Sequence, residues 1–238
     1  MTYKEVFDIS VSEQKRKENK YDIWVTYVLR PLSILFTIPL VGSKISPTSI
    51  TKLSVLCCII GFFVVSLSYN VWGLIIGWVF FFLWSLLDCI DGNVARCNNA
   101  CSQLGDLWDT TGGYAAMVLV YFSAGIVAFK NLGQFNFFDN YYYLIIGSAT
   151  SIFSIFPRLV MHKKKSSSLS SDAVKSVSDK TNFSLSQIIA MNIVAPTGCL
   201  LIIFLISMLL NMINWFVILY FILNLLIMSI SLYKLLRQ

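Results

Sequence analysis

Residues 71–90 read VWGLIIGWVFFFLWSLLDCI, an apolar stretch whose single charged residue is Asp88. A helix of about twenty residues spans roughly 30 Å, the thickness of the hydrocarbon core of a bilayer. The whole chain has a matching composition: of its 238 residues, 57% are hydrophobic and only 13% are charged. Soluble domains contain about 25% charged residues. The sequence therefore excludes a water-soluble globular protein, a disordered chain and a disulfide scaffold.

Further apolar runs of this length occur on both sides of residues 71–90, and they predict six spanning helices in total. They lie at about Thr48–Ser68, Val71–Ile90, Gly105–Phe129, Tyr141–Met161, Leu185–Leu210 and Ile213–Leu235.

The segment before the first run, residues 23–42, is also apolar, but Arg30, Pro31 and Pro39 interrupt it. Proline breaks a regular helix, so we predict a bent helix along the membrane surface, with a spanning segment as the alternative. The predicted fold is an all-α integral membrane protein with six transmembrane helices preceded by an N-terminal interfacial helix. We divide it into a cytoplasmic N-terminal segment (1–22), the interfacial helix (23–46) and the six-helix domain (47–238).

Basic residues predict the orientation in the membrane. If the N-terminus is cytoplasmic, the loops at 69–70, 130–140 and 211–212 lie outside and contain one basic residue, Lys130, while the other 17 lie in or beside cytoplasmic segments. Cytoplasmic loops are typically rich in Lys and Arg. We therefore expect a multi-pass protein with both termini in the cytoplasm. The net charge of +6 then indicates anionic membrane lipids, not nucleic acid, as partners.

The cytoplasmic loop at 162–184 is rich in Ser and Lys and has little to bury, which predicts a mobile linker. Lys163–Lys165 at its start would anchor a helix at lipid headgroups or attract an anionic substrate.

Four of the twelve acidic residues lie within a stretch of 22, at Asp88, Asp91, Asp106 and Asp109. Ionisable residues at membrane depth are costly and mark functional sites. Each pair is three residues apart, so its members share a helix face, and a short connection would bring the two pairs together. Carboxylates this close repel each other, and a hard divalent cation such as Mg²⁺ or Mn²⁺ relieves the repulsion. The sequence thus predicts a metal site on the cytoplasmic side.

Small residues and an arginine accompany these acids. Gly92 and Ala95 leave room for a ligand beside the carboxylates, and Arg96 has the forked geometry that suits a phosphate. Together they are typical of a metal–diphosphate site. A buried Asp–Arg ion-pair network that joins two helices is the structural alternative.

The spacing Asp88-x-x-Asp91-Gly92-x-x-Ala95-Arg96, eight residues, Gly105, three residues, Asp109 resembles the signature of the CDP-alcohol phosphotransferases, also called CDP-alcohol phosphatidyltransferases. These membrane enzymes move a phosphoalcohol group from a CDP-alcohol donor to an alcohol acceptor and release CMP. The resemblance implies metal ligands at Asp88, Asp91 and Asp109. It places the nucleotide-binding residues at Thr48, Thr51, Gly92, Ala95, Arg96, Ser102 and Gly105. For Pro47–Thr51, a capped helix N-terminus is an equally compatible interpretation.

The signature of this family ends with a fourth Asp, a metal ligand and the proposed base, and here that position is Gly113. Asp106 is no replacement, because seven residues of helix place it about 10 Å away along the axis. The predicted function is the transfer of a phosphoalcohol group of the phosphatidyl type. The alternative is an impaired homologue that binds CDP-alcohol or CMP without transfer. A channel would need ionisable residues inside other helices, and the fifth and sixth have none there.

Basic residues near the fourth and fifth predicted helices bear on the chemistry of the alcohol acceptor. Arg158 resembles a basic residue that the inositol-phosphate branch of the family carries at the end of its fourth helix, although an interfacial arginine is an equal interpretation. Residues 182–187 read NFSLSQ and lack the second basic residue of that branch, which argues against an inositol phosphate acceptor. The pattern Gly73-x-x-x-Gly77 is typical of close packing between helices or subunits, and we expect a homodimer.

Overall fold

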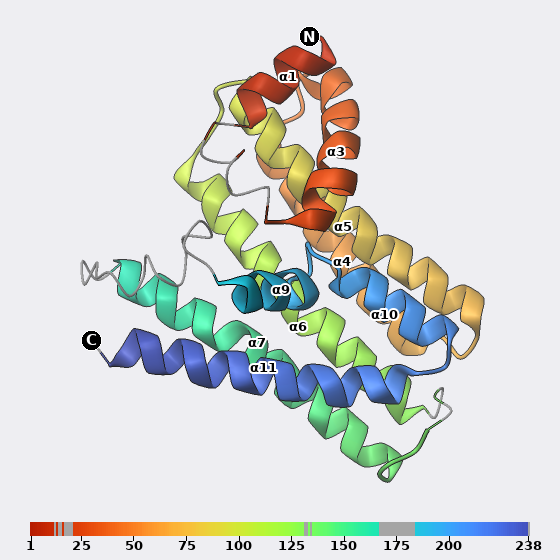
Figure 1. Cartoon of the computed structure of the whole chain (residues 1–238). Helices are drawn as coiled ribbons and strands as arrows, with labels where there is room; N and C mark the ends of the chain where they lie inside the picture. The colour runs from red at the N-terminus through yellow and green to blue at the C-terminus, as the bar shows by residue number, and fades with distance from the viewer. Residues whose placement is uncertain are drawn as a thin grey trace.

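The computed structural model describes residues 1–11, 13, 16, 21–130, 133, 135–166 and 184–237. Within these residues every regular element is a helix (Figure 1), which confirms the all-α prediction. Most of the linker predicted at 162–184 lies outside the described residues. The helices long and apolar enough to cross a membrane are α4 (Pro47–Leu67), α5 (Val71–Cys97), α6 (Gln103–Phe129), α7 (Asn140–Ser166) and α11 (Ile213–Leu236).

The predicted span at Leu185–Leu210 is not one helix, which corrects the expectation of six single spanning helices. It consists of α9 (Leu185–Val194) and α10 (Leu200–Leu209), each only about 15 Å long. The turn between them contains Pro196, which cannot continue an α-helical hydrogen-bond pattern.

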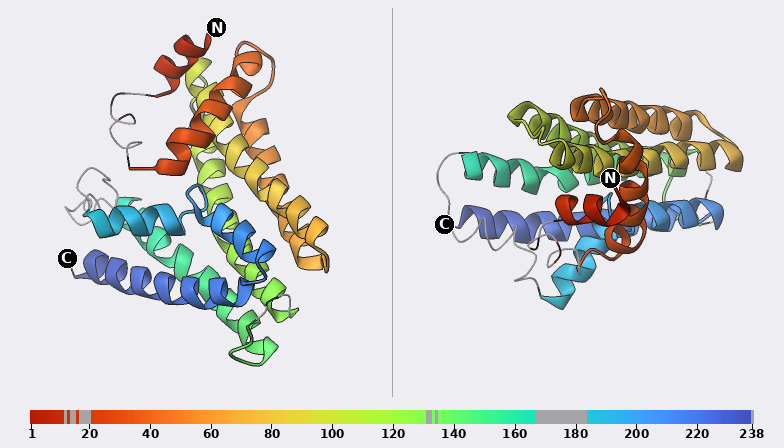
Figure 2. Two further views of the ribbon diagram at one scale, coloured as in Figure 1. Left: turned by 45° about the vertical axis from the view of Figure 1, so that its right-hand side comes forward. Right: turned by 90° about the horizontal axis from the view of Figure 1, so that it is seen from above.

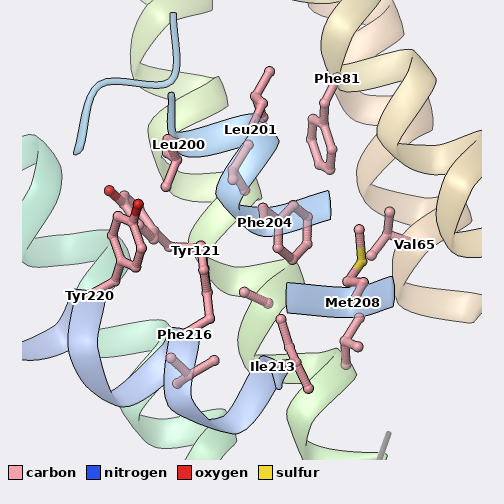
Figure 3. Packing of buried hydrophobic residues seen from close by; sticks show 14 of the residues in the cluster. Val65, Phe81, Tyr121, Leu200, Leu201, Phe204, Met208, Ile213, Phe216 and Tyr220 are labelled. Carbon is pink, nitrogen blue, oxygen red and sulfur yellow. The ribbon is translucent and has the colours of Figure 1, made fainter. Parts of the chain in front are cut away.

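Buried tyrosines satisfy the backbone that this break exposes. The hydroxyl of Tyr121 donates to the Val194 carbonyl, and that of Tyr220 donates to the Ile193 carbonyl, both at 3.0 Å. Irregular backbone at membrane depth is tolerated where the protein itself supplies such partners. Figure 3 shows α10 inserted between α5 and α11, where Leu201 and Phe204 join the main hydrophobic core.

The remaining helices pack in pairs, α4 with α5, α6 with α7 and α7 with α11, as Figures 1 and 2 show. Glycines permit two of these contacts. A Cβ atom on Gly77 of α5 would lie 2.4 Å from Val65 of α4, and one on Gly147 of α7 would lie 2.6 Å from the Cα of Gly125 of α6. Gly77 therefore allows two helices of the same chain to pack closely. Helix packing is one of the two interpretations of the Gly73-x-x-x-Gly77 pattern, and subunit packing is the other.

The region predicted as the interfacial helix is helical in three successive forms. A π-helical turn, η1 (Val25–Leu29), leads into α3 (Arg30–Thr37), and a 3₁₀ turn, η2 (Ile38–Leu40), follows it. A short N-terminal helix, α1 (Tyr3–Ser10), packs against α5 and α3 at the same end of the bundle. These elements cover the end where α5 finishes and α6 begins (Figure 1).

Lys130, the one basic residue of the predicted outer loops, has a structural role. Its Nζ donates to the carbonyls of Ser66 and Ser68 at the end of α4 and lies 4.1 Å from the centroid of the Tyr69 ring. A cation is favourable at a helix C-terminus. Burial lowers the pKa of this lysine.

Candidate functional site

Helices α4, α5 and α6 surround an open cavity of about 350 Å³ at the end of the bundle where α3 lies. Every residue that the sequence assigns to the metal or the nucleotide lines this cavity. They are Thr48, Thr51, Asp88, Asp91, Gly92, Ala95, Arg96, Ser102, Gly105 and Asp109. Arg30, Pro47, Cys89, Ala100, Cys101 and Asp106 complete the lining.

Helix α5 supplies one continuous face to the cavity. Asp88, Asp91, Gly92, Ala95 and Arg96 follow the spacing that places residues on one side of an α-helix. This requires the helix to continue past the acids, and α5 does run on to Cys97. The gap of residues 91–104 between the two predicted spans is therefore too long. The connection between α5 and α6 contains only residues 98–102.

A compact turn makes this short connection possible. Asn99 adopts a left-handed conformation with φ = 50°. Its N–H donates to the Arg96 carbonyl at 3.3 Å, and that of Ala100 donates to the Ala95 carbonyl at 2.8 Å. This is the Schellman arrangement, in which a left-handed residue satisfies the last carbonyls of a helix. The chain reverses immediately and brings the start of α6 beside the end of α5.

Polar caps fix the helix starts that face the cavity. The Ser102 hydroxyl accepts a hydrogen bond from the Gly105 N–H at 3.0 Å and caps α6. Ser46 caps α4 in the same way, and the Thr51 hydroxyl donates to the Pro47 carbonyl at 3.1 Å. The structure thus contains the capped helix start that was the alternative for Pro47–Thr51, and Thr48 and Thr51 line the cavity as well.

The carboxylates differ in exposure. Asp91 is only 4% exposed, and its Oδ2 is buried and has no hydrogen-bond partner among the described residues. Asp109 is exposed, and Asp88 on the neighbouring helix is its electrostatic neighbour. A buried carboxylate oxygen without a partner is costly. The site therefore favours a ligand that this oxygen can bind.

Three carboxylates on one cavity, with an unsatisfied oxygen among them, fit the oxygen ligands that hard divalent cations prefer. Within the described part of the chain, no group of three acidic, histidine or cysteine side chains is already arranged as metal ligands are. Joint coordination by Asp88, Asp91 and Asp109 would therefore require side-chain movement.

Arg96 is held against its own helix. Its Nη2 donates to the Asn93 Oδ1 at 3.0 Å, and a Cβ atom on Gly92 would lie 3.2 Å from both Nη atoms. Glycine at position 92 thus leaves space for the guanidinium group. Among the residues that the structure describes, Arg96 forms no ion pair with a carboxylate, so the predicted alternative of an Asp–Arg ion-pair network is not what holds these helices together.

Two positions singled out in the sequence do not line the cavity. Arg158 lies on α7, where Asp88 and Tyr114 are among its electrostatic neighbours. Gly113 lies one helical turn beyond Asp109, and a Cβ atom added there would have no neighbour within 4 Å among the described residues. The space at the family's base position is therefore open. Its neighbour Gly112 does serve packing, because a Cβ atom there would lie 3.0 Å from Val55 of α4.

Arg30 is a charged cavity residue that has no assigned role in the sequence analysis. It begins α3, directly before Pro31. The available signal was an arginine inside an apolar segment, since a charge in such a place marks a functional position. In the sequence alone, this arginine indicates only an interruption of the segment.

Comparison with known proteins is consistent with this site. The family model described as CDP-alcohol phosphatidyltransferase matches residues 44–228, which include all the cavity residues except Arg30. Neither the curated proteins nor the solved structures contain a significant match. The matched region covers more than half of the chain and runs from the start of α4 into α11. The chain therefore belongs to the CDP-alcohol phosphatidyltransferase family, the membrane transferases of phospholipid metabolism that move a phosphoalcohol group from a CDP-alcohol and release CMP.

Proposed function

We propose that the protein transfers a phosphatidyl-type group from a CDP-alcohol donor to an alcohol acceptor at the cytoplasmic face of a membrane. The observation that carries this proposal is the shared cavity, where acids from α5 and α6 meet Arg96 and two threonines of α4. Carboxylates that bind a divalent cation, together with an arginine, are suited to a diphosphate. The apolar helices around the cavity favour a lipid donor or acceptor.

Asp88, Asp91 and Asp109 would hold Mg²⁺ or Mn²⁺. A divalent ion bound there would neutralise the donor diphosphate and stabilise the charge that develops on the leaving CMP. The buried Asp91 Oδ2, which has no hydrogen-bond partner in the described part of the chain, supports this assignment most directly.

The remaining cavity residues are assigned to the nucleotide. Arg96 would bind the diphosphate, and the hydroxyls of Thr48, Thr51 and Ser102 would offer further hydrogen bonds. The small residues at this surface let the donor approach the helix backbone closely. They are Gly92, Ala95 and Gly105. Arg158, outside the cavity but in electrostatic contact with Asp88, would attract an anionic acceptor.

A second candidate function follows from Gly113. Glycine has no side chain that could accept a proton from the acceptor hydroxyl, so an impaired homologue would bind CDP-alcohol or CMP without transfer. We favour the active enzyme, because the rest of the signature is present and its residues line one cavity.

The proposal includes a cytoplasmic site, cytoplasmic termini and a homodimer. The distribution of basic residues supports the orientation. Thiol labelling of Thr2→Cys and Asp139→Cys in intact vesicles, with the six native cysteines replaced, would test the orientation. Light scattering in detergent would test the dimer. Labelling of position 2 from outside, or a monomer, would contradict these two points.

Mn²⁺ titration followed by electron paramagnetic resonance tests the assigned site. In the presence of CDP-diacylglycerol we expect the wild-type protein to bind Mn²⁺ and Asp91→Asn to lose this binding. Asp106→Asn is the matched control, since Asp106 lines the same cavity but is not an assigned ligand. Equal Mn²⁺ affinity in wild type and Asp91→Asn would refute the metal assignment.

A further inference from the structure

Two arginines line the same cavity, and neither pairs with a carboxylate of the residues that the structure describes. Arg30 of α3 and Arg96 of α5 both line it, and each is an electrostatic neighbour of the other. Among the described residues neither forms an ion pair, and the Nε atom of each is buried without a hydrogen-bond partner. Two like charges with unused donors at one surface are unfavourable unless an anion lies between them.

The local backbone explains how Arg30 reaches this place. Pro31 has no N–H and its ring would clash with the carbonyl four residues earlier in a regular helix. The chain avoids this clash with the π-helical turn η1, in which the Arg30 N–H donates to the Val25 carbonyl. The extra residue rotates the chain by about 100° relative to a continuous α-helix. Such π turns are rare overall, and those that do occur often lie at functional sites.

Asn93 couples the two arginines. Its Nδ2 donates to the Ser33 and Thr37 hydroxyls of α3, at 3.1 and 3.4 Å, while its Oδ1 accepts from Arg96. Asn93 is fully buried. One side chain therefore fixes the position of α3, which begins with Arg30, and the conformation of Arg96.

We propose that Arg30 and Arg96 together bind the diphosphate of the CDP-alcohol donor, which makes α3 part of the donor site. This inference rests on the proposed function, and it concerns a segment outside the family match at residues 44–228. Guanidinium groups bind phosphate through paired hydrogen bonds. A diphosphate offers a phosphoryl group to each arginine, whereas CMP offers only one phosphate. The pair would therefore bind the donor more tightly than the product and favour the release of CMP.

The first test compares the binding of CDP and CMP to the purified protein by calorimetry, with Mg²⁺ and with EDTA. Loss of a hydrogen bond to a charged group lowers affinity by about 10- to 100-fold. We expect Arg30→Gln to weaken CDP binding by this factor and CMP binding much less. The matched control is Lys44→Gln, which removes a positive charge from the exposed loop before α4 and does not line the cavity. It should bind both nucleotides as wild type does.

Thermal unfolding distinguishes ligand binding from a structural role of Arg30, because loss of a structural role would lower the unfolding temperature of the nucleotide-free protein. Without nucleotide, Arg30→Gln relieves the repulsion from Arg96, so it should unfold at the same or a higher temperature than wild type. With CDP it should gain less stability than wild type. Arg30→Lys keeps the charge without the fork, and we expect it to bind CDP with intermediate affinity.

Three results would overturn the inference. CDP binding by Arg30→Gln at wild-type affinity would exclude Arg30 from the donor site, and an equal loss for CDP and CMP would exclude a diphosphate clamp. Arg30 would instead bind a lipid headgroup if vesicles that contain phosphatidic acid displaced CDP from the wild type but not from Arg30→Gln, and if the two proteins bound CDP with equal affinity. Failure of the wild type to bind either nucleotide would instead refute the proposed function, and with it this inference.

Discussion

The contact between α6 and α7 allows a quantitative prediction about a single methyl group. Gly147→Ala would place a Cβ atom 2.6 Å from the Cα of Gly125, 3.0 Å from its N and 3.1 Å from the Tyr121 carbonyl. All three are backbone atoms, so no side chain can rotate away. The two helices must move apart to relieve the clash.

The expected cost follows from two opposing effects. Overpacking of a tight interface costs about 1–3 kcal/mol, whereas replacing glycine by alanine in a helix gains about 1 kcal/mol. The contact at 2.6 Å is severe enough to place the cost in the upper half of its range. We therefore expect a net destabilisation of about 1–2 kcal/mol, or roughly 2–8 °C in unfolding temperature for a chain of this size.

Differential scanning fluorimetry in detergent measures this shift. Gly113→Ala is the matched control, because the Cβ atom it adds has no neighbour within 4 Å. This variant should unfold at the wild-type temperature or slightly above it. If Gly147→Ala were as stable as wild type while Gly113→Ala were destabilised, the helix packing described here would be wrong.

Three further predictions concern the site. Removal of divalent ions with EDTA, or Asp91→Asn, should abolish CMP release while the protein stays folded in detergent; activity that survives both treatments contradicts the metal assignment. Arg96→Lys should weaken CDP-alcohol binding more than it lowers the unfolding temperature, and calorimetry that shows the reverse would assign Arg96 a structural role. Gly113→Asp adds a carboxylate in open space one turn from Asp109, where it should crowd the acceptor and lower CMP release; a silent wild type that this change rescues would identify an impaired homologue, since general-base catalysis is worth about 10²–10⁴-fold.

Length and composition predicted most of the fold, because a bilayer imposes a minimum length on each apolar helix. The same criterion failed at Leu185–Leu210. Its apolar residues continue through Pro196, but the hydroxyls that make the break possible belong to Tyr121 and Tyr220, which are distant in sequence. A partner that only folding brings near cannot be identified from the local sequence.

The candidate site was predictable to a similar extent. Helical spacing identified the acids, small residues and arginine of the cavity, namely Asp88, Asp91, Gly92, Ala95, Arg96, Asp106 and Asp109. The resemblance added Thr48, Thr51, Ser102 and Gly105. The contribution of α3 was not predictable in this way. Arg30 reaches the cavity through a π-helical turn and through the hydrogen bonds of Asn93 to α3, and neither leaves a periodic pattern in the sequence.

The most direct test of this account is the release of CMP by the purified protein in detergent. Labelled CDP-diacylglycerol and CDP-choline would be offered separately, with Mg²⁺ or Mn²⁺ and an alcohol acceptor, and Asp91→Asn would be assayed beside the wild type. Our expectation is that the wild type releases CMP only when both the metal and the acceptor are present, and that Asp91→Asn releases none. Binding of CDP-diacylglycerol without any release of CMP would contradict it.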